Sequence, residues 1–148
     1  MKTTTIDRQK LIAVLADAIA TKEGFFGKNK SGIPAVSQRL NNPGCLRAWK
    51  NAAGHKMPRV NGLVQFATEA DGFRALRAQC KINVFKRGLT LVQFFCGKPG
   101  VYYGFAAKTQ GQDPDSYITF IQRFMVSRLG VSFAVNVPIN SLLGKGAF

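Results

Sequence analysis

The spacing of apolar residues along the chain predicts a protein built mainly from helices. Between residues 7 and 22, apolar side chains recur at intervals that place them on one helix face, and Gly24 then follows as a natural terminator. The same periodicity predicts helices over 69–86 and 114–129. A shorter, very apolar helix is predicted in the segment LVQFFCG at 91–97 and is expected to lie in the core.

Local start signals support these helices. Thr68–Asp71 and Thr90–Gln93 each have the order of a capping box, in which the side chains at both ends satisfy backbone N–H groups of the first turn. Asp113 followed by Pro114 is typical of a helix N-cap with proline at the first helical position. One further helical turn is expected around Ser141 in the C-terminal segment.

Residues 27–62 are rich in Gly, Asn, Pro and Ser and show no sustained periodicity, which indicates an irregular lobe with loops or a short hairpin. No segment alternates cleanly between apolar and polar residues as a half-buried strand would. The expected fold class is therefore mainly α: a helical body and a small irregular or hairpin lobe, with a cleft between them.

Length and charge narrow the functional classes. A chain of 148 residues with 46% apolar residues can bury one real core, so we expect one domain over residues 1–148. The formal charge of +14 predicts an anionic partner, such as nucleic acid, a membrane surface or an acidic cell-wall polymer. Charge alone does not choose among these partners.

Cysteine and histidine usage gives no sign of a metal site. Cys45, Cys80 and Cys96 contain no C-x-x-C pair, and the one histidine, His55, has no ligand at metal-binding spacing. We expect free thiols, no metal and no cofactor. The polar N-terminus does not resemble a secretory signal peptide, and no apolar stretch is long enough to span a membrane.

Glu23 is the first candidate for chemistry, because it closes the first predicted helix directly before Gly24, Phe25 and Phe26. The negative end of the helix dipole and nearby aromatic rings both favour a neutral, protonated carboxyl group. Such a group can donate a proton to a leaving oxygen, as the general acid of glycosidic cleavage does. The alternative is an ordinary solvated glutamate at a helix end.

A second candidate is the segment QRLNNPGCLR at 38–47. Asn-Pro and Pro-Gly favour turns, and the amides of Asn41 and Asn42 can bond either their own backbone or a ligand. Taken alone, this segment is better explained as an ordinary turn.

Taken together, these segments resemble a known family. Glu23-Gly24-Phe25, Asn-Asn-Pro-Gly-Cys-Leu-Arg at 41–47, Gly-Leu-Val-Gln-Phe at 62–66, Gly-Phe-Arg-Ala-Leu at 72–76 and Gly-Leu-Thr-Leu at 88–91 occur in the order seen in phage and bacterial lysozyme-like proteins. Those proteins are similar to soluble lytic transglycosylases, which have a lysozyme fold and act on the glycan strands of peptidoglycan. The resemblance covers about residues 12–130.

The resemblance implies roles for particular residues. It makes Glu23 the general acid, gives Asn41 and Asn42 supporting roles in substrate binding, and makes Gln65 a substrate contact. The chain departs from the family pattern at Cys45, where asparagine is usual, and in the segment GKPGVYYGFA, which only approximates a proline-rich stretch.

Glu69 is the candidate for a second carboxylate, which a glycoside hydrolase requires. Glu69 and Asp71 are the only acids near the matched motifs, and both are also explained as helix-cap residues. A lytic transglycosylase needs no second carboxylate, because groups of the sugar itself do that work. The scarcity of acids therefore favours transglycosylation over hydrolysis.

Three aromatic residues are candidates for stacking on sugar rings, because a flat ring face suits a pyranose and the polar edge can hydrogen-bond. Trp49 is preferred, since it lies in the polar lobe. Tyr102 and Tyr103 are equally well explained as core residues.

The sequence thus predicts a monomeric lysozyme-like muramidase or lytic transglycosylase of phage origin. It would be associated with a virion and its proteins, or act as an endolysin from the host cytoplasm, and would attack the cell wall in the periplasm. One rival is a virion or wall-binding protein that has lost catalysis. The other is a basic nucleic-acid-binding protein, but the helix at 114–129 offers only Arg123 and Arg128, so no specific nucleic-acid partner is expected.

Overall fold

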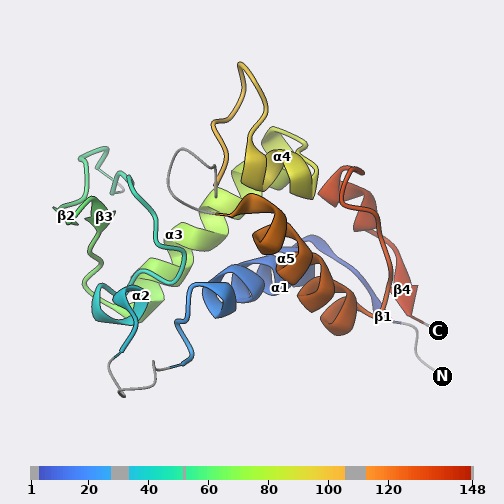
Figure 1. Ribbon diagram of the computed structural model, residues 1–148, viewed down its shortest axis with the longest axis horizontal. Coiled ribbons are helices and arrows are strands. Elements are labelled where there is room, and N and C mark those ends of the chain that lie inside the picture. The colour runs from blue at the N-terminus through green and yellow to red at the C-terminus, as the bar shows by residue number, and fades with distance from the viewer. Residues whose placement is uncertain (1–3, 28–33, 52, 106–112, 148) are drawn as a thin grey trace. The chain divides into compact units, whose positions relative to one another are not determined.

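Helices carry most of the regular structure, as the periodicity predicts. The computed structural model describes residues 4–27, 34–51, 53–105 and 113–147. The main helices, labelled in Figure 1, are α1 (Arg8–Lys22), α3 (Glu69–Lys81), α4 (Leu91–Cys96) and α5 (Pro114–Leu129). The protein is therefore mainly α, which confirms the coarse fold class.

Capping residues fix the starts of two helices as predicted. Thr90 and Gln93 form a complete capping box on α4, with both backbone-to-side-chain distances at 3.1 Å. The carboxylate of Asp113 accepts a hydrogen bond from the backbone N–H of Ser116, and Pro114 opens α5. Both of these helix starts are confirmed.

The helix predicted over 69–86 is not one continuous α-helix. It changes after Lys81 into a π-helical turn, Ile82–Lys86. Asn83 and Val84, in this π turn, are both buried. The chain is therefore helical over 69–86 as predicted, but periodicity does not show where α hydrogen bonding changes to π hydrogen bonding.

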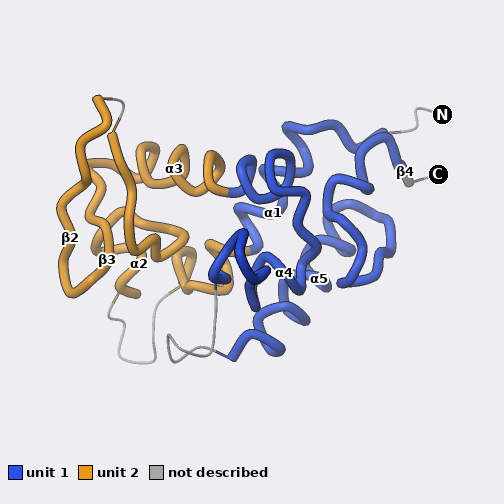
Figure 2. The backbone as a smooth tube through the Cα atoms, turned by 90° about the horizontal axis from the view of Figure 1, so that it is seen from above, with its two compact units in different colours: residues 1–18, 80–148 blue, residues 19–79 orange. Residues whose placement is uncertain are grey.

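The chain forms two compact units, shown in different colours in Figure 2. Unit 1 contains residues 1–18 and 80–148, and unit 2 contains residues 19–79. The chain passes from unit 1 to unit 2 within α1 and returns within α3. The single domain expected over residues 1–148 stays a prediction.

Unit 1 is held by an apolar helical core. Helices α4 and α5 pack against each other, and β1 (Thr4–Thr5) pairs antiparallel with β4 (Gly146–Ala147), so both ends of the chain meet (Figure 1). The aromatic rings between α4 and α5 form one cluster: Phe94, Phe95, Phe105 and Tyr117. The helical turn expected around Ser141 is present as a 3₁₀ turn, Ile139–Leu142.

Unit 2 contains the irregular lobe, the last residues of α1 and most of α3. It contains the short helix α2 (Val36–Arg39) and the antiparallel hairpin β2 (Arg59–Val60) with β3 (Leu63–Val64). The predicted short hairpin is therefore confirmed. Outside these elements, the backbone groups of unit 2 bond both to other backbone groups, as Phe66 does to Leu40, and to side chains.

No helix in the described part of the chain is both long and apolar enough to cross a membrane.

Candidate functional site

Glu23 occupies a backbone position that is fixed from both sides. Its N–H donates to the carbonyl of Ile19, in the continuation of α1, at 2.9 Å. Its own carbonyl accepts a hydrogen bond from the buried Ser37 hydroxyl of α2 at 3.0 Å. Gly24 then ends the helix with a φ of 75°, the left-handed conformation that glycine adopts without strain.

The segment after Glu23 is held by the side chain of a single residue, Gln38. Its amide nitrogen donates to the carbonyl oxygens of Phe25 and Gly27, and its amide oxygen accepts from the N–H of Ala35 at 3.1 Å. Helix α2 therefore holds the chain on the C-terminal side of Glu23. A carboxyl group on a fixed backbone has fewer orientations to lose when a ligand binds.

The side chain of Glu23 contacts Cys45, which comes from the Asn-Asn-Pro-Gly turn. The Cys45 thiol hydrogen-bonds to the Glu23 carboxyl group. Burial raises the pKa of Cys45 well above its ordinary value, and the negative charge of Glu23 raises it further, while Arg47 opposes the change. The thiol is consequently a protonated S–H donor toward Glu23 at neutral pH.

The turn that carries Cys45 is built from strained but well-supported backbone. Asn41 and Cys45 have positive φ angles of 52° and 49°, which few residues other than glycine tolerate. The turn lies on α3 at Gly72, where an added Cβ would come within 1.9 Å of the carbonyl oxygen of Asn41. This close approach explains why the Gly-Phe-Arg-Ala-Leu segment begins with glycine.

Asn42 is a buried residue of the turn, and its side chain bonds to backbone groups. Its side chain is completely buried, and its amide nitrogen donates to the carbonyls of Leu46 and Val64 at 3.0 and 2.9 Å. Its amide oxygen accepts from the N–H of Leu46 at 2.9 Å. These bonds tie the turn to β3, and contact of Asn42 with substrate stays a prediction.

Asn41 is half-buried, and its amide nitrogen donates to the carbonyls of Phe66 and Ala67 at 3.1 and 3.3 Å. Gln65 lies beside this segment with an exposed side chain, and its backbone N–H donates to Pro58. Substrate contact by Asn41 and by Gln65 stays a prediction.

Aromatic residues adjoin Glu23 in sequence and form a small group. Phe25 and Phe73 are buried and meet edge to face at a centroid distance of 5.2 Å. Phe26 stacks on Phe73 at 6.1 Å but remains 60% exposed. The exposed part of the Phe26 ring offers an apolar surface three residues after Glu23 in the chain.

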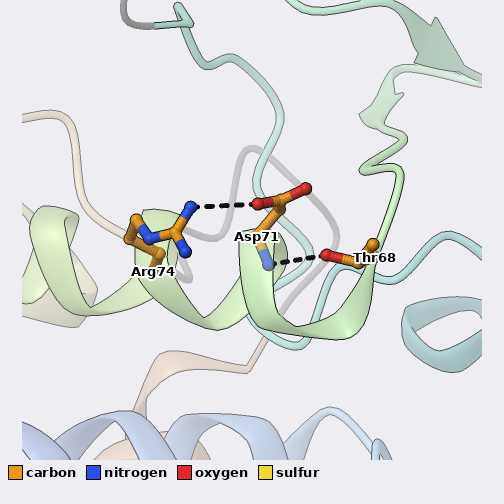
Figure 3. A network of polar contacts seen from close by, with 3 residues as sticks. All are labelled: Thr68, Asp71 and Arg74. Carbon is orange, nitrogen blue, oxygen red and sulfur yellow. Dashed lines mark hydrogen bonds and ion pairs between the residues drawn. The ribbon is translucent and has the colours of Figure 1, made fainter.

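The candidate second carboxylate, Glu69, lies exposed in the first turn of α3. The carboxylate of the nearby Asp71 forms an ion pair with Arg74 at 3.0 Å (Figure 3). The predicted capping box at Thr68 is only half right. The N–H of Asp71 does donate to the Thr68 hydroxyl at 3.1 Å, but the Asp71 side chain turns to Arg74 instead of back to Thr68.

Trp49 is half-buried and lines a pocket of about 480 Å³ within unit 2. Neither Glu23 nor Gln65 is among the residues that line this pocket. The predicted substrate residues of unit 2 thus fall into two groups, one around Glu23 and the turn, the other around Trp49.

The two tyrosines belong to unit 1. Tyr102 is half-buried, with its ring 5.0 Å from that of Tyr103 and 4.9 Å from the guanidinium of Arg87. Burial raises the pKa of Tyr102 to about 12, against a smaller opposing effect of its hydrogen bond with Asn83. Tyr103 is 69% exposed. Their contact with substrate stays a prediction.

Sequence reasoning missed the two residues of α2 that fix Glu23, namely Ser37 and Gln38. It also gave no role to Cys45, although that position was noted as a departure from the family pattern. The departure was the available signal, since Cys45 is the turn residue that contacts Glu23. Among the described residues, no three or more His, Cys, Asp and Glu side chains come together as a metal site would require.

Comparison of the chain with protein-family models, with curated proteins and with solved structures gives no match.

Proposed function

We propose that this protein cleaves the glycan strands of peptidoglycan, with Glu23 as the general acid in a cleft of a lysozyme-like fold. One observation carries the proposal: the Glu-Gly-Phe and Asn-Asn-Pro-Gly-Cys segments, which are distant in sequence, meet at the Glu23 carboxyl group through the Cys45 thiol. A general acid needs a defined orientation toward the leaving oxygen, and a fixed backbone together with a side-chain donor provides one.

The charge of unit 2 supports an anionic substrate. Residues 24–68 contain seven lysines and arginines and no acidic residue. Peptidoglycan and its attached polymers are anionic, so a cationic lobe would concentrate the enzyme on the wall. Binding through charge alone would leave no role for the fixed carboxyl group of Glu23, which favours an enzyme over a binding protein.

The chemistry that suits a single acid is transglycosylation. Glu23 donates its proton to the glycosidic oxygen as the bond to the anomeric carbon breaks. The 6-hydroxyl oxygen of the same sugar then bonds to that carbon, and its proton returns to the Glu23 carboxylate. The products are a 1,6-anhydro sugar and a new chain end, and no water is consumed.

The alternative outcome is hydrolysis with Glu69 as a second carboxylate. Asp71 is less suited to that task, because it is already paired with Arg74. In either case we expect the protein to act as a monomer on the wall, delivered within a virion or as an endolysin.

Mass spectrometry of the products from purified peptidoglycan tests this proposal. The unmodified protein should release anhydro-muropeptides, and Glu23→Gln should reduce their rate of release by about a hundredfold or more. Glu69→Gln is the matched control, since Glu69 is the one other glutamate in the sequence. It should retain activity.

Reducing muramic acid ends, together with loss of activity in Glu69→Gln, would mean hydrolysis by two carboxylates. No products from folded protein would overturn the proposed enzyme and favour a wall-binding role.

A further inference from the structure

The pocket beside Trp49 lies between a loop of the lobe and the first turns of α3. The loop folds back on itself, with the N–H of Met57 donating to the carbonyl of Trp49 at 2.8 Å and Lys50 pairing with Lys56 in an antiparallel bridge. The whole pocket belongs to unit 2. Its volume, about 480 Å³, is typical of sites for small molecules.

The walls of the pocket are apolar, with many small methyl groups. They are formed by Trp49, Met57, Phe66, Ala67, Ala75 and Ala78. An apolar wall accepts alkyl groups at no cost, but a pyranose ring would leave several hydroxyl groups there without partners. The walls therefore favour small aliphatic side chains over a sugar.

The polar residues that line the pocket are Lys50, Asn51, Asp71 and Arg74. The charge of Asp71 is already compensated by Arg74. The Arg74 side chain is nevertheless 76% exposed, and a guanidinium has five N–H donors, so its bond to Asp71 leaves others for a ligand carboxylate. Lys50 adds a second exposed cation.

We propose that this pocket binds the peptide arm of peptidoglycan, a short anionic peptide with alanine side chains. The methyl groups of the peptide would fill the apolar walls, and its carboxylates would meet Arg74 and Lys50. The choice of a peptidoglycan peptide as the ligand rests on the proposed function. The shape and charge of the pocket are independent of that function. The enzyme would then recognise peptide-bearing strands through a site separate from Glu23.

Single-stranded nucleic acid fits the pocket less well. Bases stack on open aromatic faces while phosphates follow a continuous basic groove. Trp49 instead is half-buried among methyl groups. The peptide is therefore the favoured occupant, and the nucleic acid is an alternative that the experiment separates.

Trp49 is the one tryptophan in the sequence, so intrinsic fluorescence reports directly on this pocket. We would titrate the full-length protein with a synthetic stem tetrapeptide that contains alanine, isoglutamate, lysine and D-alanine and has no aromatic group. Its N-terminus is acetylated, so that the peptide is anionic as in the wall. We expect a saturable change in tryptophan emission. The peptide has no glycosidic bond, so Glu23→Gln should bind it as well as the unmodified protein does.

Two variants on α3 form a matched pair. Arg74→Glu should weaken peptide binding by about tenfold or more, since it replaces a charged donor with a repelling group. Arg77→Glu should change binding by less than about twofold, because Arg77 lies over the ring of Phe73 and does not line the pocket. Ala78→Leu keeps a good helix former but fills the pocket, and it should abolish the fluorescence change.

Unchanged emission at millimolar peptide would overturn this proposal, even if peptidoglycan is cleaved and the proposed function holds. A larger response to chitotetraose or to oligothymidylate than to the peptide would also overturn it and would assign the pocket to glycan or to nucleic acid. Conversely, peptide binding without any cleavage of peptidoglycan would support the proposed peptide site and overturn the proposed enzymatic function.

Discussion

Units 1 and 2 are stabilised by different kinds of interaction. The largest fully buried side chains of the described residues belong to unit 1, with the exceptions of Ile19 and Leu76. Unit 2 buries two polar side chains, Ser37 and Asn42, which bond to backbone groups of its loops, whereas the larger unit 1 buries one, Asn83, among the described residues. Regular helices satisfy their own backbone, whereas irregular chain needs polar side chains inside.

This difference between the two units bears on the function proposed for Glu23. A catalytic carboxyl group needs neighbours that can hydrogen-bond to it, and these come more readily from a turn than from a packed helical core. Glu23 lies at the place where a regular helix ends and the irregular lobe begins. We therefore expect the two regions to respond differently to substitution.

The largest effect on stability is expected in the aromatic cluster of unit 1. Phe95 is fully buried and contacts Phe94, Phe105 and Tyr117. Phe95→Ala should lower the free energy of unfolding by about 3–5 kcal/mol, because it removes buried area and leaves a cavity. Denaturant unfolding followed by circular dichroism would measure this loss.

Phe26→Ala is the control for that experiment, since Phe26 is largely exposed and belongs to unit 2. It should cost less than about 1 kcal/mol. Equal losses in the two variants would contradict the view that apolar packing is concentrated in unit 1.

A smaller but specific effect is expected at Asn42. Asn42→Ala would remove three buried hydrogen bonds to backbone groups of Leu46 and Val64 and leave the Leu46 N–H without this acceptor, so the free energy of unfolding should fall by about 2–3 kcal/mol. Hydrogen exchange should show the loss of protection in residues 40–66 more strongly than in α5. Cleavage should fall as well, because the turn would no longer hold Cys45 against Glu23.

Asn51→Ala tests whether any lobe asparagine has the same effect. Asn51 is exposed, and its side chain accepts hydrogen bonds only from the loop N–H groups of Ala53 and His55 among the bonds described. The expected cost is below about 1 kcal/mol. A cost as large as that of Asn42→Ala would show that burial is not the reason for the Asn42 effect.

The smallest effect is on the reactivity of Cys45, and it depends on pH. Because burial and Glu23 raise the pKa of Cys45, its reactive thiolate is scarce near neutral pH, and alkylation should be slow. Glu23→Gln removes the negative charge and should accelerate alkylation several-fold. The exposed Cys96 provides an internal reference in the same sample.

The raised pKa of Cys45 also makes the stability of the folded protein depend on pH. A thiol whose pKa is raised on folding binds its proton more tightly in the folded state. Its contribution is complete below the ordinary thiol pKa and declines as the pH rises above that value. If alkylation of Cys45 were equally fast in Glu23→Gln and the unmodified protein, the contact between the two side chains would be refuted.

The sequence by itself determined the longer helices and several of their ends. The starts of α4 and α5 follow from Thr90, Gln93, Asp113 and Pro114, because a cap satisfies backbone groups only a few residues away. The end of α1 at Gly24 is local for the same reason. Glu23 could also be singled out from sequence, since its place at the helix end depends on neighbouring residues alone.

Tertiary structure alone decided which residues meet Glu23 and which are hidden. Glu23 contacts Cys45 and its carbonyl accepts a hydrogen bond from Ser37, while the buried Asn42 bonds to Val64. Each of these interactions joins segments that are far apart in the chain. The π-helical turn and the pairing of β1 with β4 likewise depend on distant packing. Periodicity and capping describe interactions within a few residues, so they cannot specify contacts that form only when the whole chain is folded.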